Sequence, residues 1–219
     1  MMTKATEPTK SLLPRKDRIY NAARDLFFKY GYRGTSMDMI ARKAGYSKKS
    51  IYLDYRNKDD LFLNLVAEGT AILLDKLLQI PHERLEVEDA IVAFFKVYYD
   101  FSSQYSEYFK MAFSEATPEV VANSPPALQR KLADLSRACM EEAVKVARRA
   151  IEAGIVIPID PWEAAGVFLG AATGNIMLAN GAGQTLFAAD KLDNISAKSV
   201  KIILRGIRVR PGDGADLCP

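Results

Sequence analysis

A stretch near the N-terminus, from Thr35 to Leu61, constrains the fold of this chain more than any other segment. Its sequence is TSMDMIARKAGYSKKSIYLDYRNKDDL, in which apolar residues recur at helical spacing between residues that begin and end helices. Thr35 is a candidate N-cap with Asp38 as its reciprocal partner three residues later. Gly45 can adopt the left-handed conformation that commonly ends a helix. We therefore predict a short helix that ends at about Ala44.

Two further helices are predicted after the glycine turn. Ser47 can cap a helix with the sequence KKSIYLDY, whose Ile51 and Tyr55 lie one turn apart and would face the first helix. Asn57 can cap the next helix, which has acidic residues in its first turn, where the helix dipole favours negative charge. An apolar stripe over residues 15–30 predicts a preceding helix that completes a three-helix core. This layout is a helix-turn-helix, which indicates DNA binding.

The second helix of the pair has the composition of a recognition helix. The positions left free by its apolar side are Lys48, Lys49, Ser50, Leu53 and Asp54. Lysine can donate to guanine O6 and N7, leucine can touch a thymine methyl group, and aspartate can accept from cytosine N4. The alternative is that these residues are the solvated face of a helical domain that binds no DNA.

The charge distribution favours the DNA-binding interpretation. Residues 1–60 contain 14 Lys and Arg against 7 Asp and Glu, a net charge of +7. The whole chain has 30 against 27, so the remainder has 16 against 20, a net charge of −4. A basic N-terminal part on a mildly acidic remainder suits a protein that binds phosphates at one end.

Residues 15–65 resemble the DNA-binding domain of the TetR family of bacterial transcriptional regulators. The shared features are a GY pair before the first cap, a T-x-x-x-I-A-x-x-A-G core, S-K-x-x-[LI]-Y, and an aromatic-x-x-K-x-x-L exit. The residues that carry them are Gly31, Tyr32, Ser36, Ile40, Ala41, Ala44, Gly45, Ser47, Lys48, Ile51, Tyr52, Tyr55, Lys58 and Leu61. The resemblance implies phosphate contacts by Ser36, Ser47, Tyr52 and Lys58, and base contacts by Lys48, Lys49, Ser50, Leu53 and Asp54. Asp54 departs from the family pattern, because a neutral or basic residue is more usual there; an acid beside the phosphates would narrow sequence choice or weaken binding.

The remainder of the chain has helical signals and no strand-like alternation, so we predict an all-α protein. Further helices are expected at about 58–79, 86–103, 105–121, 125–153, 160–180 and 196–208. The predicted organisation is a disordered arm at 1–14, a helix-turn-helix domain at 15–62, a helical ligand-binding and dimerisation domain at 63–210, and a flexible tail at 211–219.

Aromatic residues are concentrated in the middle of the chain. We predict that an apolar cavity between helices is lined by Phe94, Tyr98, Phe101, Tyr105 and Phe109. Tyrosine hydroxyls such as those of Tyr98 and Tyr105 could orient a small apolar or aromatic effector. The alternative is that these rings only fill the core. The TetR resemblance implies that an effector bound in the body moves the DNA-binding parts of a dimer apart, so that DNA affinity falls.

Three glycines, Gly166, Gly170 and Gly174, lie four residues apart in one predicted helix. Each costs roughly 1 kcal/mol relative to alanine within a helix, so a compensating close contact is expected. With Ile203 of the last predicted helix they could form a four-helix dimer interface, which the resemblance implies because two DNA-binding domains read a palindrome. Alternatively, the glycines admit another helix of the same chain or make room for a ligand.

Residues with catalytic or metal-binding chemistry are sparse. The one histidine, His82, follows a proline and is expected in a surface loop, and the paired acids Asp59-Asp60 and Glu141-Glu142 are expected on solvated faces. The two cysteines, Cys139 and Cys218, are expected to be free thiols, the former a small buried side chain. No catalytic motif, cofactor motif or metal site is present, and glycines and asparagines interrupt the charge-free stretch at 164–189, so no membrane span is expected.

Together these features predict a cytoplasmic, homodimeric transcriptional repressor that a small effector releases from a palindromic double-stranded operator. One alternative is a helix-turn-helix regulator whose body docks another protein and senses no small ligand. A second alternative is a small helical enzyme that uses a tyrosine acid near Tyr98 or Tyr105. A cavity of several hundred cubic ångströms would favour the effector hypothesis, whereas a packed core would favour docking.

Overall fold

The computed structural model describes residues 13–180, 198 and 202. Its elements are helical, which confirms the all-α prediction. They are α1 (Arg15–Gly34), α2 (Met37–Ala44), α3 (Lys48–Ile51), α4 (Lys58–Leu78), the 3-10 turn η1 (His82–Arg84), α5 (Val87–Gln104), α6 (Ser106–Lys110), the π turn η2 (Met111–Glu115), α7 (Pro118–Ala122), α8 (Pro126–Glu152) and α9 (Pro161–Asn180).

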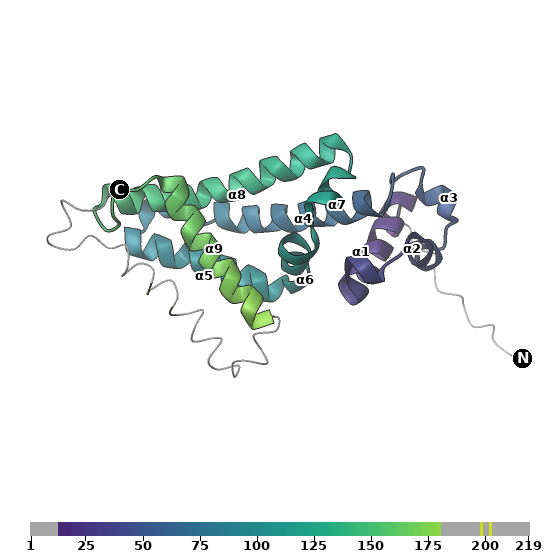
Figure 1. Cartoon of the computed structure of the whole chain (residues 1–219), viewed down its shortest axis with the longest axis horizontal. Helices are drawn as coiled ribbons and strands as arrows, with labels where there is room; N and C mark the ends of the chain where they lie inside the picture. The colour runs from purple at the N-terminus through teal and green to yellow at the C-terminus, as the bar shows by residue number, and fades with distance from the viewer. Residues whose placement is uncertain (1–12, 181–197, 199–201, 203–219) are drawn as a thin grey trace, which may run out of the picture.

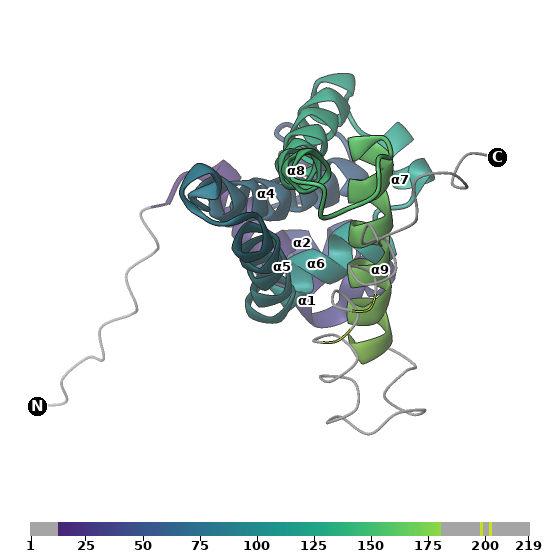
Figure 2. The ribbon, with the colours of Figure 1, turned by 90° about the vertical axis from the view of Figure 1, so that its left-hand side faces the viewer.

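The molecule is elongated, with α1, α2 and α3 gathered at one end (Figure 1). We call these helices and the first turn of α4 the head, and the remaining elements the body. Helix α4 begins in the head and continues along the body against α8, so that one helix joins the two parts. Viewed along the long axis, α4, α5, α8 and α9 pack together in the body (Figure 2).

The core of the head is built from the apolar positions that the sequence periodicity predicts. Ile19 of α1, Ile40 of α2 and Ile51 of α3 are fully buried, and Tyr55 is only 5% exposed. Burying each large apolar side chain contributes about 1.5–3 kcal/mol. The ring of Phe27 packs edge-on against that of Phe62 from α4, with centroids 5.2 Å apart, so α4 closes the three-helix core.

The predicted cap of α2 is wrong by one residue. Ser36, not Thr35, is the N-cap, and its Oγ accepts a hydrogen bond of 3.2 Å from Met39 N. The Thr35 side chain is instead buried and donates its hydroxyl to Gly31 O at 2.9 Å, where it ties off the end of α1. Serine and threonine are both good N-caps. Ser36 takes this role because the Thr35 side chain is already hydrogen-bonded to Gly31 O. Gly45 ends α2 with a φ of 73°, as predicted.

The single helix predicted at 105–121 is wrong as well. Helix α6 ends at Lys110 and continues as the π turn η2, after which Ala116 leaves helical geometry with a ψ of 73°. Thr117 then caps α7, and Pro118 occupies its first position. Proline lacks an N–H and suits the first turn of a helix, so the Thr-Pro pair marks a helix start inside a continuous apolar pattern.

Several expected segments lie outside the described residues. These are most of the N-terminal arm, nearly all of the helix expected at 196–208, the C-terminal tail, and Cys218. Within the described part of the chain, no helix combines the length and the apolar character needed to cross a membrane.

Candidate nucleic-acid interface and effector cavity

The head presents the residues of α3 and the turn after it on an open surface. Lys48 and Lys49 are exposed, and Tyr52 is 47% exposed. Leu53 is 71% exposed, the highest value among the large hydrophobic side chains of the described residues. An apolar side chain left in water at this position has the exposure that contact with a thymine methyl group requires.

Ser47 caps the N-terminus of α3, and Ser50 within the helix is its partner. Ser47 Oγ accepts from Ser50 N at 3.1 Å and lies 2.8 Å from Ser50 Oγ. The Lys48 ammonium forms an exposed ion pair with Asp38 of α2, with Nζ 3.0 Å from Oδ2. Such an exposed pair is worth little in water, so Lys48 can leave it for a base edge or phosphate at small cost.

Asp54, which the sequence assigns to base contact, is held by another part of the head. Arg15 at the start of α1 donates from Nε to Asp54 Oδ2 at 2.8 Å and from Nη2 to Oδ1 at 2.9 Å. This bidentate guanidinium holds the pKa of the Asp54 carboxyl below its usual value. The carboxylate therefore satisfies its acceptors within the head and neutralises Arg15 at the same time.

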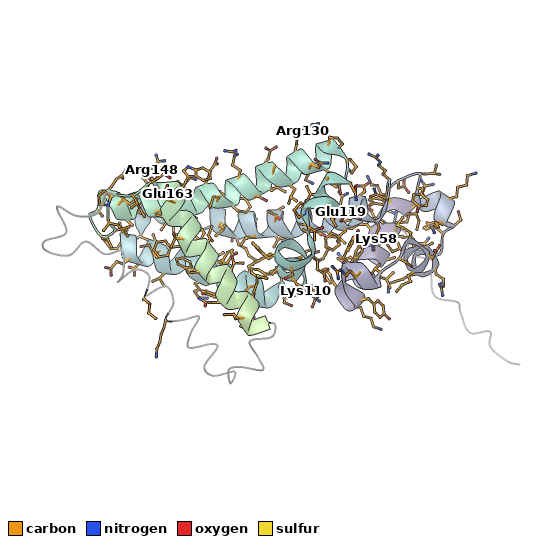
Figure 3. All side chains as sticks on the ribbon, viewed as in Figure 1. Lys58, Lys110, Glu119, Arg130, Arg148 and Glu163 are labelled. Carbon is orange, nitrogen blue, oxygen red and sulfur yellow. The ribbon has the colours of Figure 1, made fainter. Side chains whose placement is uncertain are left out.

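Lys58 also has partners within the head, where Figure 3 labels it. Its ammonium donates to Tyr32 O at 2.9 Å and to Thr35 O at 3.2 Å, and lies 3.9 Å from the centroid of the Tyr32 ring. Burial lowers the pKa of Lys58. An ammonium has three N–H donors, so one remains for a phosphate oxygen.

The body contains a large cavity between α4, α5, α6, α8 and α9. Its volume is about 690 Å³, and its walls are predominantly apolar. The polar side chains in the wall are Thr70, Tyr98, Tyr108, Ser136, Cys139 and Thr173. None of the described side chains that line it is charged. Such a space suits an uncharged ligand or the apolar portion of an amphiphile.

The structure separates the five aromatic residues predicted to line a cavity. Phe94, Tyr98 and Phe101 line it. Tyr105 does not line it and stacks on Phe101 with ring centroids 5.4 Å apart. Phe109 does not line it either and packs against Phe113, which does. All lie on one aromatic stretch of sequence, and only the packing of the surrounding helices decides which rings border the space.

Of the two tyrosines predicted to orient an effector, Tyr98 is the one that lines the cavity. Its oxygen lies 2.7 Å from Thr173 Oγ1 on α9, and the ring is 3% exposed. Burial raises the pKa of Tyr98 to about 12, so the hydroxyl is neutral at physiological pH. It can donate or accept a hydrogen bond, but it is not poised as an acid.

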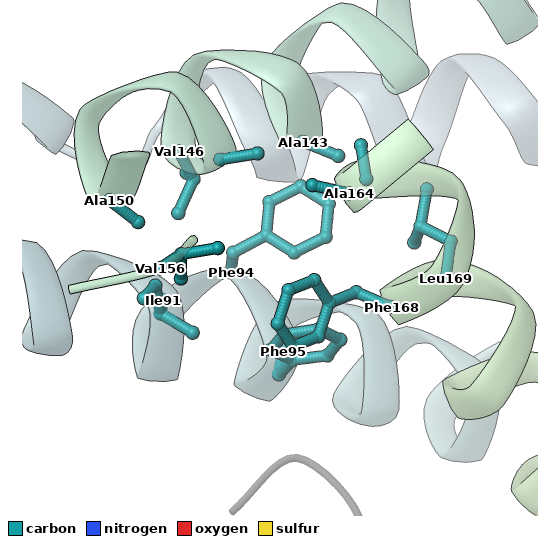
Figure 4. Close-up of a pocket in the computed structure, with 12 residues that line it drawn as sticks. Ile91, Phe94, Phe95, Ala143, Val146, Ala150, Val156, Ala164, Phe168 and Leu169 are labelled. Carbon is teal, nitrogen blue, oxygen red and sulfur yellow. The ribbon is translucent and has the colours of Figure 1, made fainter. Parts of the chain in front are cut away.

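A second apolar gap between α5, α8 and α9 is packed core. Figure 4 shows the Phe94 ring among Ala143 and Val146 of α8 and Ala164 of α9. The gap has a volume of only about 30 Å³. This is about the space that one water molecule occupies in the liquid, which excludes an organic ligand.

Comparison with known proteins agrees with the geometry of the head. A family model described as bacterial regulatory proteins of the tetR family matches residues 19–65, which include α2, α3 and the Gly45 turn. This chain belongs to the TetR family. It is a DNA-binding transcriptional regulator, and the family is not one of enzymes.

Two helix-turn-helix transcriptional regulators resemble the chain over about two thirds of their own length. RutR of Escherichia coli K12 is 26% identical over 153 residues, which are 70% of this chain and 69% of RutR. IcaR of Staphylococcus epidermidis, a negative regulator of a biofilm operon, is 25% identical over 130 residues, which are 59% of this chain and 68% of IcaR.

Solved structures share the fold of the whole described chain. A tetR-family protein from Rhodococcus RHA1 superposes with a TM-score of 0.69 at 18% identity, covering 91% of this chain and all of that one. The regulator FadR of Bacillus subtilis, solved in complex with stearoyl-CoA, superposes with a TM-score of 0.65 at 16% identity, covering 88% of this chain and 99% of FadR.

The glycines of this TetR-family chain border open space. Gly170 and Gly174 line the cavity, and Gly166 does not. A Cβ atom added at any of the three would meet no described atom within 4 Å. No described helix of the same chain therefore packs closely on this stripe. Ile203, the fourth residue assigned to the dimer interface, lies outside the described residues.

Two interpretations of titratable residues are wrong. Both ring nitrogens of His82 are buried without a hydrogen-bond partner, and Nε2 lies 3.5 Å from the Oε2 atom of Glu142, which is only 5% exposed. Asp59 and Asp60 are 9% and 8% exposed, with Asp60 Oδ2 accepting from Arg56 N at 2.9 Å. Asp60 helps to fix the start of α4, and Glu142 of α8 lies against the turn after α4, a long-range contact that helical periodicity does not show.

The described residues contain no group of three or more potential metal ligands. Cys139 is partly buried in the cavity wall, with Sγ 3.8 Å from Thr70 O, and burial raises the pKa of its thiol to about 12. Neither Arg15 as the partner of Asp54 nor Tyr108 as a residue of the cavity wall was predicted from the sequence. Local sequence carries no signal for a pair 39 positions apart.

Proposed function

We propose that the protein is a homodimeric repressor that an apolar effector releases from a palindromic operator. The observation that carries this proposal is a large cavity, with no charged side chain among its described lining residues, in the body of a chain whose head is a TetR-type helix-turn-helix. Its volume of about 690 Å³ falls within the range of about 300–1,000 Å³ that small-molecule sites occupy. A protein-docking regulator would need no such space. Binding to chromosomal DNA would place the protein in the cytoplasm.

Two kinds of DNA contact are proposed for residues of the head. We assign phosphate contacts to Ser36, Ser47, Tyr52 and Lys58, and base contacts to Lys48, Lys49, Ser50 and Leu53. Asp54 acts differently, because Arg15 occupies both of its carboxylate oxygens. We propose that it restrains the charge of Arg15 beside the DNA and reads no base itself.

The effector is proposed to carry a long apolar portion. The described residues of the cavity wall offer hydroxyl, thiol and backbone groups but no charge, so a carboxylate or phosphate buried among them would have no counter-ion. FadR of Bacillus subtilis, which shares the fold, was solved with stearoyl-CoA. An acyl chain in the cavity with its charged group at the opening satisfies both observations, and we propose acyl thioesters or fatty acids as the class.

Helix α9 supports the dimer. Trp162, Val167, Met177 and Leu178 are each at least 40% exposed on it, and the glycines leave its surface open. Apolar side chains gathered on one exposed helix mark an association surface. A symmetric pair of such helices would bury them and place two heads for two half-sites about 34 Å apart along the DNA.

The test is binding of the purified full chain to duplexes from the promoter region beside its own gene, over a salt series, with and without stearoyl-CoA. We expect selective binding whose affinity falls at least tenfold with saturating stearoyl-CoA. Selective binding that neither stearoyl-CoA nor a fractionated metabolite extract changes would refute effector release, and the absence of any selective duplex would refute operator recognition.

A further inference from the structure

We propose that Tyr108 of α6 transmits occupation of the cavity to the head, through a carboxylate that it shares with Tyr20 of α1. This inference rests on the proposed function, because it assigns the regulation of the same cavity to one residue.

A hydrogen-bonded bridge links the cavity wall to α1. The Tyr108 ring lines the cavity, and its hydroxyl donates to Glu68 Oε2 at 2.9 Å. The Tyr20 hydroxyl donates to the same Oε2 atom at 2.7 Å. One oxygen of an α4 side chain therefore holds a donor from the head and a donor from the body. Hydrogen bonds to an ionised carboxylate are roughly twice as strong as those between neutral groups.

A second, apolar contact runs in parallel with this bridge. The Tyr108 ring meets that of Phe28 on α1 edge-on, with centroids 5.0 Å apart and an angle of 86° between the planes. Any displacement of the Tyr108 ring therefore acts on α1 twice, through Glu68 and through Phe28.

The packing of α4 leaves Tyr108 no room to yield in that direction. A Cβ atom at Gly69 would lie only 2.7 Å from Tyr108 Cβ and 2.9 Å from its Cγ, so the tyrosine already rests on the glycine backbone. A ligand that presses on the ring from the cavity cannot push it into α4. The ring has to move relative to Phe28 and Glu68, and thus relative to the head.

The bridge keeps its two hydroxyl donors at physiological pH. Burial and the Glu68 carboxylate raise the pKa of Tyr108 to about 12, and the same two causes raise that of Tyr20. Both hydroxyls therefore remain protonated.

Tyr98 provides the matched comparison. It also lines the cavity, but its hydroxyl pairs with Thr173 on α9 and not with any residue of the head. Removing the Tyr98 hydroxyl should change the affinity for the ligand. Removing the Tyr108 hydroxyl should instead change how much the bound ligand lowers operator affinity.

The first experiment measures the coupling factor, defined as the ratio of the operator Kd with saturating stearoyl-CoA to the Kd without it. It uses the full chain, Tyr108→Phe and Tyr98→Phe, with stearoyl-CoA affinity determined by calorimetry. We expect Tyr108→Phe to bind stearoyl-CoA within about twofold of the unsubstituted chain but to lose roughly tenfold in coupling, since one hydrogen bond to a charged group is lost. Tyr98→Phe should keep its coupling factor. A Tyr108→Phe variant with full coupling would overturn the proposal.

The second experiment needs no ligand and separates this proposal from the effector assignment. Amide hydrogen exchange in α1 is measured for the same three proteins. We expect exchange in α1 to be roughly tenfold faster in Tyr108→Phe and unchanged in Tyr98→Phe. If stearoyl-CoA fails to bind the unsubstituted chain, the effector class is wrong and the exchange result alone decides. Unchanged exchange in α1 would then overturn the role of Tyr108, and faster exchange would support it.

Discussion

At the scale of single residues, the ionic partners within the head decide which charges are available to DNA. The family pattern implies that Asp54 faces bases, but the structure gives it a bidentate partner, Arg15. An acid that occupies an arginine reduces the number of cations that can meet phosphates, and affinity for all sequences depends on that number. Asp54 therefore affects the ratio of specific to non-specific DNA affinity.

Replacing Asp54 with asparagine should free Arg15. We expect tighter binding to every duplex, a smaller ratio of specific to non-specific affinity, and a salt slope steeper by about one unit for each head. Fluorescence anisotropy over a salt series measures all three. Asp100→Asn makes the same charge change at an ion pair with Lys96 in the body and should leave the slope unchanged. A weaker, less salt-dependent Asp54→Asn would show that the carboxylate itself contacts a base.

Lys58 combines a structural role with its proposed contact. In Lys58→Met, the Tyr32 and Thr35 carbonyls lose their charged donor, so we expect the free energy of unfolding to fall by about 1–3 kcal/mol. We also expect the salt slope to fall by roughly one unit. Lys49→Met, at an exposed position of α3, should leave stability unchanged. Denaturant titration and the salt series separate the effects, and an unchanged slope would leave Lys58 with its structural role alone.

At the scale of elements, the turn between α4 and α5 is fastened to α8 by buried polar groups. Arg149 Nη2 donates to Leu85 O at 2.9 Å, and Nη1 donates to His82 O. The His82 ring lies beside Glu142, with Lys145 and Arg149 also facing it. Burial lowers the pKa of His82, and the two cations add to this effect, while Glu142 opposes it.

This turn should make stability depend on pH in mild acid. Because the pKa of His82 is lower in the folded state than its ordinary value of about 6.5, the unfolded chain binds the proton first as the pH falls. The contribution is therefore fully present above about pH 6.5 and is lost as the pH falls below it. Urea midpoints at pH 7.5, 6.5 and 5.5 should fall more steeply for the unsubstituted chain than for His82→Asn. Parallel declines would mean that His82 contributes nothing.

At the scale of the whole molecule, the elongated arrangement separates DNA contact from dimer contact. The head lies at one end and α9 crosses the body (Figure 1), so the proposed interface can set the distance between two heads without touching DNA. Helix α9 also carries Gly170 and Gly174 in the cavity wall. A ligand in the cavity therefore touches the helix proposed for the interface as well as Tyr108.

The dimer proposal predicts a strong effect of charge on α9. Val167 is 55% exposed, and Val167→Glu would bury two carboxylates in the proposed interface. We expect a monomer at micromolar concentration by sedimentation velocity, with operator affinity reduced at least tenfold because the two heads no longer bind together. Val92→Glu, at a valine of α5 that is 60% exposed, is the matched control and should remain dimeric. A Val167→Glu variant that stays dimeric would place the interface elsewhere.

The sequence by itself determined the helical class, the helix-turn-helix and most helix ends. These features are encoded by neighbours along the chain: Ser47 and Asn57 cap the helices that they precede, Gly45 ends α2, and Ile51 recurs at the period that faces the core. The roles assigned to the DNA-contacting residues remain predictions.

Only the tertiary structure decided which side chains meet across long sequence separations. The pairing of Asp54 with Arg15, the burial of Glu142, the break after Lys110 and the shared Glu68 carboxylate all depend on how helices pack. The aromatic stretch predicted a cavity, but helix packing selected Phe94, Tyr98 and Phe101 for its wall and not Tyr105 or Phe109. Local propensity and periodicity describe one helix at a time, whereas a cavity or a buried ion pair is a property of several helices together.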